Sequence, residues 1–195
     1  GTMGSGIATA ALLAGYAVTM VERDETGLDR GRDTVAKNLE GAVKRGKMST
    51  AARDDALAAR CTGHTELATL DTCELIIEAA FEDMAVKQEI FRTLDAVARP
   101  GAILATNTSY LDVNAIAAAT TRPADVIGLH FFSPAHVMRL LEVVVADATA
   151  PDVVATGFRL AKRLGKVAVR AGVCEGFIGN RILSHYRKSA EYLVL

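Results

Sequence analysis

The order of hydrophobic and polar positions predicts strands and helices that alternate along this chain. Short apolar runs predict buried strands, whereas apolar residues spaced by three and four predict helices that bury one face. The expected strands are 17–21, 75–80, 102–106, 126–132, 140–145 and 167–169. The expected helices are 7–13, 28–47, 50–59, 84–98, 113–119 and 151–164, and helical spacing returns over 176–195.

Helix 84–98 has the clearest amphipathic pattern. Its apolar residues Val86, Ile90, Leu94 and Val97 follow one another at intervals of three and four. Such residues lie on one side of a helix. We therefore expect this stripe to pack against the sheet.

The alternation of strands and helices favours an α/β fold with a doubly wound, mostly parallel sheet. The chain begins inside a glycine-rich turn, and a turn of this kind normally follows a strand at the centre of such a sheet. At the other end, helical spacing continues to Leu195 without a capping residue. We therefore expect the sequence to be a fragment of a longer protein. Residues 133–138 form the one irregular stretch between strands and are typical of a site loop.

Composition excludes several classes of function. The 22 Lys and Arg residues nearly balance 23 Asp and Glu residues, and this gives no basic stripe for a nucleic-acid partner. Half of the residues are hydrophobic, which excludes a disordered tail. Residues 1–21 carry no charge, but their glycines and the lack of a basic flank argue against a membrane span or signal peptide. Three cysteines without metal-ligand spacing indicate reduced thiols and no metal site.

A glycine-rich turn opens the first predicted helix, and the strand after that helix ends at an acidic residue. Glycines at Gly1, Gly4 and Gly6 would let a pyrophosphate reach the backbone at the helix N-terminus. Glu22 stands about where a carboxylate accepts hydrogen bonds from an adenosine ribose. That carboxylate would repel a 2′-phosphate, so the pattern favours NAD over NADP. The alternative is a tight turn that only allows close helix packing.

Polar residues occur at the ends of two predicted strands. Asn107 and Ser109 follow strand 102–106, at the edge where open α/β sheets bind ligands. Small polar residues at this position are also common turn formers. His130 stands late in an apolar strand, where it is either a base or a structural histidine.

Two further residues complete the candidate chemistry. Glu142 lies in an apolar strand, and a carboxylate in that setting usually has a partner. If neighbouring strands bring Glu142 to His130, the carboxylate fixes the imidazole tautomer and raises its basicity. Asn180 stands at the start of the last predicted helix, where it could hold a carbonyl or hydroxyl group or simply cap the helix.

Five segments, in order along nearly the whole chain, resemble the L-3-hydroxyacyl-CoA dehydrogenase family. They are Gly-Thr-Met-Gly-Ser-Gly-Ile-Ala (1–8), Asn-Thr-Ser (107–109), His-Phe-Phe-Ser-Pro-Ala-His-Val-Met (130–138), Leu-Leu-Glu-Val-Val (140–144) and Gly-Phe-Ile-Gly-Asn-Arg (176–181). They most resemble the dehydrogenase part of bifunctional hydratase–dehydrogenase enzymes of fatty-acid β-oxidation. The resemblance implies a Rossmann-like NAD-binding domain over 1–171 that lacks its first strand. It also implies that 172–195 begin an all-helical domain, which in the family carries most dimer contacts.

The resemblance further implies oxidation of a (3S)-hydroxyacyl-CoA to a 3-ketoacyl-CoA with NAD. His130 would be the general base, Glu142 its orienting partner, and Ser109 and Asn180 the polar groups around the substrate C3 oxygen. The expected cofactor contacts are Gly1, Met3, Gly4, Glu22, Glu78, Lys87, Asn107 and Ser133. Asn38 and Arg45, on a helical arm, are expected to reach the coenzyme A portion of the substrate.

Two other functions stay open at this point. The chain could be a catalytically silent module that only binds NAD or a partner, because both ends of the fold would be absent. It could also belong to the NAD-dependent β-hydroxyacid dehydrogenases that act on free carboxylates, although these use a catalytic lysine. The expected partners are an acyl-CoA substrate and either a second copy of the protein or a fused hydratase domain. The expected location is the cytoplasm, or a peroxisome or mitochondrion in a eukaryote.

Overall fold

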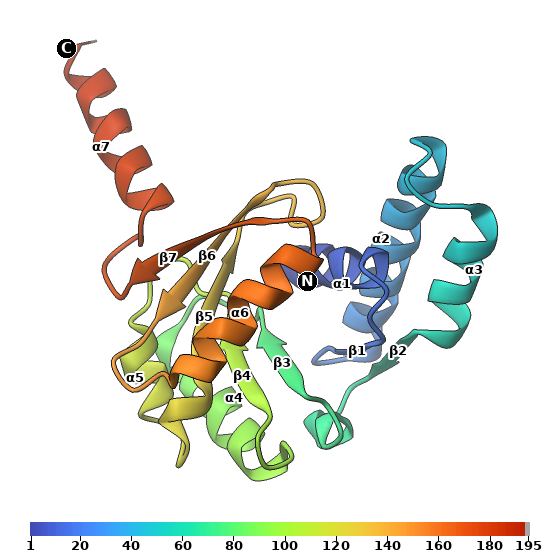
Figure 1. Ribbon diagram of the computed structural model, residues 1–195, viewed down its shortest axis with the longest axis horizontal. Helices are drawn as coiled ribbons and strands as arrows, with labels where there is room; N and C mark the ends of the chain where they lie inside the picture. Colours follow the sequence, from blue (N-terminus) through green and yellow to red (C-terminus); the bar gives the residue numbers. More distant parts are fainter. Residues whose placement is uncertain (194–195) are drawn as a thin grey trace.

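The computed structural model describes residues 1–193 as an α/β fold (Figure 1). Its strands are β1 (Val18–Val21), β2 (Cys61–His64), β3 (Leu75–Glu78), β4 (Ile103–Thr106), β5 (Val126–Phe131), β6 (Leu140–Val145) and β7 (Val167–Gly172). Its α-helices are α1 (Thr2–Leu13), α2 (Glu25–Lys44), α3 (Thr50–Ala59), α4 (Met84–Val97), α5 (Val113–Ala117), α6 (Pro151–Arg163) and α7 (Gly179–Tyr192). Two short 3₁₀ helices, η1 (Leu67–Leu70) and η2 (Pro123–Asp125), complete the connections.

The strands form two sheets. β1 pairs with β2 in parallel, and the larger sheet has the order β3-β4-β5-β6-β7. Within the larger sheet only β5 and β6 pair antiparallel, while the other neighbours are parallel. The expectation of a mostly parallel α/β fold is confirmed. Residues 132–139 join β5 directly to β6, so the end of β5 lies beside the start of β6.

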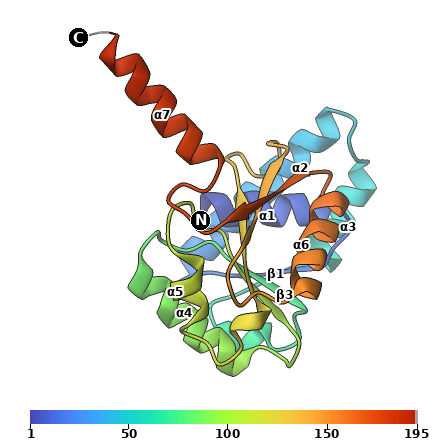
Figure 2. The same cartoon turned by 60° about the vertical axis from the view of Figure 1, so that its left-hand side comes forward.

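Helices pack on both faces of the larger sheet, and Figures 1 and 2 show α6 on one face and α4 with α5 on the other. On the α6 side, Val153 and Ala161 are buried in a cluster with Leu129 and Val143. On the α4 side, Phe91 is buried in a cluster that includes residues of β3 and β4. α1, α2 and α3 enclose a third cluster beside β1 and β2. Each face of the larger sheet is therefore covered by helices and a buried hydrophobic cluster.

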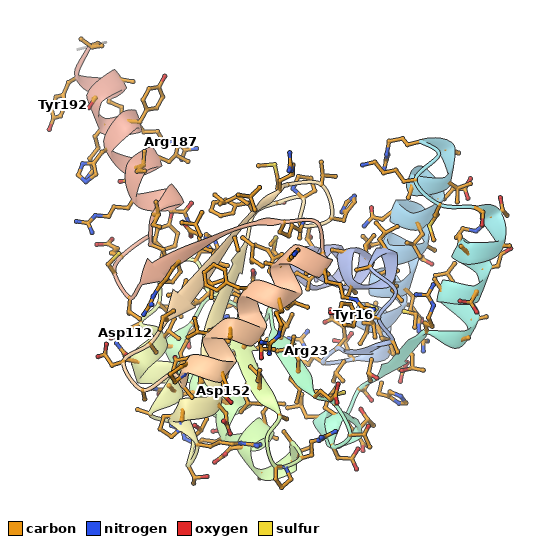
Figure 3. All side chains as sticks on the ribbon, in the orientation of Figure 1. Tyr16, Arg23, Asp112, Asp152, Arg187 and Tyr192 are labelled. Carbon is orange, nitrogen blue, oxygen red and sulfur yellow. The ribbon has the colours of Figure 1, made fainter. Side chains whose placement is uncertain are left out.

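Helix α7 stands away from the rest of the molecule (Figure 2). Residues 181–193 are all exposed, and Figure 3 shows the labelled Arg187 and Tyr192 on this projecting helix. The predicted helix reached Leu195, but residues 194–195 lie outside the described part of the chain. The division into 1–171 and 172–195 stays a prediction.

The structure corrects the predicted face of α4. Val86 is 41% exposed, whereas the buried positions are Lys87, Phe91 and Leu94. Leu94 is buried as predicted and Ile90 packs partly buried against the same cluster, but the pattern missed Lys87, a charged residue that lies in the core next to a carboxylate. The buried face is therefore shifted by about one residue from the predicted one.

Two strands also differ from the prediction. β2 was not predicted, because Cys61-Thr-Gly-His64 has no apolar run and pairs only with β1. β7 extends to Gly172 instead of ending at residue 169, because it pairs with β6 over the whole length of that strand. In both cases the neighbouring strand, more than the local sequence, determines the element.

Candidate active site

A histidine and a glutamate from adjacent strands form the centre of the candidate site. Antiparallel pairing of β5 and β6 places His130 directly opposite Glu142. The imidazole Nδ1 lies 2.7 Å from Glu142 Oε2, and both side chains are almost completely buried. The predicted contact between the side chains of His130 and Glu142 is therefore present in the structure.

Glu142 is held by the main chain as well as by His130. Its Oε1 accepts hydrogen bonds from the Ile178 and Gly179 N–H groups at 3.1 and 2.7 Å. Burial opposes ionisation of this carboxyl, but the hydrogen bonds from His130 and from these N–H groups outweigh it. The pKa of Glu142 consequently lies below its ordinary value, so the residue is a carboxylate at neutral pH.

Aromatic rings enclose the imidazole. The His130 ring lies 4.5 Å from the Phe132 ring and 5.6 Å from the Phe177 ring, measured between centroids. These contacts restrict the rotation of His130. Asn180 is half-buried in the first turn of α7, directly after the residue whose N–H bonds Glu142. Asn180 therefore directly follows a residue that bonds Glu142.

Glu82 organises the turn that carries Ser109. Its Oε1 accepts hydrogen bonds from the Thr108 hydroxyl at 2.6 Å and from the Ser109 and Tyr110 N–H groups at 2.7 and 3.1 Å. Burial alone would raise the pKa of Glu82. These hydrogen bonds and the nearby Lys87 ammonium lower the pKa by more than burial raises it, so the pKa lies below its ordinary value. Glu82 is not among the site residues predicted from the sequence. The local sequence gave no signal for it, because its hydrogen-bond partners lie 26 to 28 residues away.

Asn107 connects the end of β4 to the strand that carries His130. Its Oδ1 accepts a hydrogen bond from the Phe131 N–H at 2.9 Å, and its side chain is buried. Asn107 thus fixes the backbone next to His130. Its expected contact with the cofactor stays a prediction.

Glu78 and Lys87 form a buried ion pair beneath this edge of the sheet. Lys87 Nζ lies 2.7 Å from Glu78 Oε1, and the two side chains are 1% and 2% exposed. Glu78 also accepts hydrogen bonds from the Thr106 hydroxyl and the Ala80 N–H. Lys87 Nζ lies 3.5 Å from Glu82 Oε2, so the pair supports the turn of Ser109 from below. This packing gives both residues a structural role, and their expected contact with the cofactor stays a prediction.

The predicted glycine-rich turn is the first part of helix α1, where Gly6 packs against Ala135. A Cβ added at Gly1 or Gly4 would meet no atom within 4 Å, so the backbone at the start of α1 faces open space. Glu22 directly follows β1, and its carboxylate lies next to Gly1 at the start of α1. Met3 is half-buried and packs against the core, which anchors this turn. These residues fit a dinucleotide, with its pyrophosphate over the glycines and its ribose at Glu22.

The remaining predicted contacts lie apart from the His130–Glu142 pair. Asn38 donates a hydrogen bond to the Thr9 hydroxyl at 3.2 Å and so ties α2 to α1. Arg45 is exposed at the end of α2. Ser133 is exposed in the loop between β5 and β6. None of these three has a direct bond to the pair in the described residues, and their roles stay predictions.

Neither a membrane helix nor a metal cluster occurs in the described part of the chain. Among residues 1–193, no helix is both long and apolar enough to cross a bilayer. In the same range, no three His, Cys, Asp or Glu side chains gather in a way that could hold a metal ion.

Comparison with protein families identifies the domain. Residues 1–174 match the family described as 3-hydroxyacyl-CoA dehydrogenase, NAD binding domain. The chain belongs to this family. The expected resemblance is therefore confirmed, and so is NAD as the cofactor of this domain. The match also agrees with the open space beside Gly1 and Gly4 and with the place of Glu22 directly after β1.

Individual relatives support the same assignment. The chain is 44% identical over 194 residues to the peroxisomal bifunctional enzyme of Danio rerio. This alignment covers 100% of this chain and 26% of that protein. It is 39% identical over 183 residues to 3-hydroxybutyryl-CoA dehydrogenase of Clostridioides difficile, covering 94% of this chain and 65% of that protein. The chain thus spans about a quarter of the length of the bifunctional relatives it matches.

Solved structures confirm the Rossmann-like fold. The crystal structure of M. tuberculosis FadB2 superimposes with a TM-score of 0.94 at 43% identity, covering 100% of this chain and 68% of that one. The crystal structure of 3-hydroxybutyryl-CoA dehydrogenase from Escherichia coli gives a TM-score of 0.92 at 38% identity, covering 100% of this chain and 42% of that one. The predicted fold class is confirmed.

Proposed function

We propose that this domain oxidises a (3S)-hydroxyacyl-CoA to the 3-ketoacyl-CoA in fatty-acid β-oxidation, with His130 as the general base. The observation that carries the proposal is the 2.7 Å contact between His130 Nδ1 and Glu142 Oε2 in a buried setting. A carboxylate there favours the tautomer in which Nδ1 carries the proton. The lone pair of Nε2 is then available for a proton from the substrate.

The reaction follows from this arrangement. Nε2 of His130 accepts the proton of the C3 hydroxyl group, and the O–H electron pair becomes the second bond of the new carbonyl group. When bound, NAD⁺ supplies the acceptor for the hydride that leaves C3. Glu142 stabilises the imidazolium that forms, because its negative charge lies next to the ring.

Ser109 and Asn180 orient the substrate oxygen in this proposal. Ser109 lies on the turn that Glu82 fixes, and Asn180 lies in the first turn of α7. Side chains on fixed backbone can meet developing charge without reorganising. Glu22 and the glycine turn hold the cofactor, whereas Asn38 and Arg45 face the coenzyme A portion.

We further propose that this domain is one part of a larger protein. We infer a helical domain that begins at residue 172 and a fused hydratase domain or a second copy as partner. Support comes from the match of this chain to only 26% of a peroxisomal bifunctional enzyme. The cytoplasm, a peroxisome and a mitochondrion all stay open as locations.

Two measurements test the proposed function. Fluorescence titration with NADH measures cofactor binding, and absorbance at the NADH band with acetoacetyl-CoA measures turnover in the reverse direction. Binding together with turnover supports the dehydrogenase. Binding without turnover in the parent protein favours a silent NAD-binding module, and turnover of free 3-hydroxy acids instead of their thioesters favours the β-hydroxyacid dehydrogenase class.

A further inference from the structure

The segment between β7 and α7 has an unusual backbone. Gly176 has a φ of 70° and Phe177, which carries a side chain, has a φ of 46°. A Cβ at Gly176 would lie 2.9 Å from the Arg181 backbone nitrogen, so only glycine fits there. Positive φ is uncommon for a residue like Phe177 and persists only where the surroundings fix it.

The surroundings of Phe177 do fix it. Its side chain is 2% exposed and packs with Val144 and Ala171, which belong to β6 and β7. Its ring also lies 5.6 Å from the His130 ring. The turn is therefore anchored to β7 and to β6, the strand that carries Glu142.

The turn directs two main-chain N–H groups toward the carboxylate of Glu142. Ile178 and Gly179 donate to Glu142 Oε1 at 3.1 and 2.7 Å, while Oε2 of the same carboxylate bonds His130. Glu142 is thereby fixed through both oxygens. A buried carboxylate with one free oxygen could rotate away from the imidazole, and these two N–H groups prevent that rotation.

We propose that residues 176–179 are a positioning element, in which the turn at Gly176 and Phe177 directs two main-chain N–H groups onto Glu142 and so holds it in register with His130. The catalytic meaning of this inference rests on the proposed function. The same turn leads directly into Asn180, so one short segment places both the partner of the base and a candidate substrate contact.

The chain offers a matched pair of variants for the test. Gly179 is the first residue of α7, and Ile178 before it has a φ of −99° and a ψ of −58°. A following proline disfavours this helical conformation, so Gly179→Pro also strains Ile178, equally with Glu142 and with Gln at position 142. Gly179→Pro removes the N–H group that bonds Glu142. Gly179→Ala keeps that N–H group and adds the same Cβ, which would lie 2.8 Å from Phe132 Cζ in both variants.

The comparison is made in the parent protein, first with Glu142 intact and then with Glu142→Gln. We expect Gly179→Pro to unfold on the order of 5 °C below Gly179→Ala, because a hydrogen bond to a charged group is lost. With Glu142→Gln this difference should fall to about half, because a neutral acceptor is bonded more weakly. With Glu142 intact, kcat of Gly179→Pro should be about tenfold below that of Gly179→Ala, with an unchanged KM for NAD.

Each result has a defined meaning. Equal unfolding temperatures for the two variants would overturn the proposal, and so would a difference that Glu142→Gln leaves undiminished. Equal kcat values would overturn the catalytic part. If the unfolding temperatures behave as expected but the parent protein does not convert acyl-CoA substrates, the proposed function fails and the positioning of Glu142 stands.

Discussion

Replacement of Lys87 by methionine tests whether the ion pair under the sheet edge stabilises the fold. The substitution leaves the Glu78 carboxylate without its cation at a position where both side chains are at most 2% exposed. Breaking a buried pair by removing one partner typically costs about 3–5 kcal/mol. Glu78 keeps its hydrogen bonds from the Thr106 hydroxyl and the Ala80 N–H, so we expect a loss near the lower end of that range, about 3 kcal/mol.

Urea unfolding at pH 7, followed by circular dichroism, measures this loss as a change in midpoint at constant slope. Arg92→Met is the matched control on the same helix, because the Arg92–Glu89 pair is exposed and such pairs contribute about 0–1 kcal/mol. A Lys87→Met loss no larger than that of the control would refute the structural role. Normal stability combined with weaker NADH binding would support a cofactor contact for Lys87 instead.

Three further predictions concern other parts of the fold. Gly128→Ala should cost about 1–3 kcal/mol of unfolding free energy, because its Cβ would lie 2.7 Å from the Val144 Cβ; an unchanged thermal midpoint would contradict this. Lys166→Met should speed hydrogen exchange in loop 133–138, whose carbonyl groups Lys166 bonds, and Lys166→Arg should restore part of the protection; equal exchange in all three proteins would contradict it. Glu82 has a depressed pKa in the fold, so it contributes stability above its unfolded pKa of about 4.3 and loses it as the pH falls through the folded value. Glu82→Gln should therefore lose less stability between pH 7 and pH 3 in urea unfolding than the parent does, and an equal loss would contradict the assignment.

The sequence predicted the parts of the structure that depend on local pattern. The apolar run Leu140–Val145 became β6 with the same bounds. The approach of Glu142 to His130 was predictable because a single loop joins their strands and a carboxylate among apolar residues needs a partner. Fold class and family followed from the order of such elements and motifs.

The features that sequence reasoning missed depend on contacts between distant segments. Glu82 bonds the Thr108 hydroxyl and the main-chain N–H groups of Ser109 and Tyr110, and only the fold brings these together. Lys87 is a charged residue in a core position, so a hydrophobic pattern could not place it. The N–H groups of Ile178 and Gly179 bond Glu142, but a pattern of side chains cannot predict hydrogen bonds that main-chain groups make.

Turnover of His130→Gln in the full-length parent protein tests the central claim most directly. The neutral amide keeps a polar side chain of similar size but cannot accept the substrate proton as an imidazole does. General base catalysis typically contributes about 10²–10⁴-fold, so kcat for oxidation of (3S)-hydroxybutyryl-CoA should fall by at least about 10²-fold, with NADH affinity nearly unchanged. A variant that turns over at close to the parent rate would show that His130 is not the base.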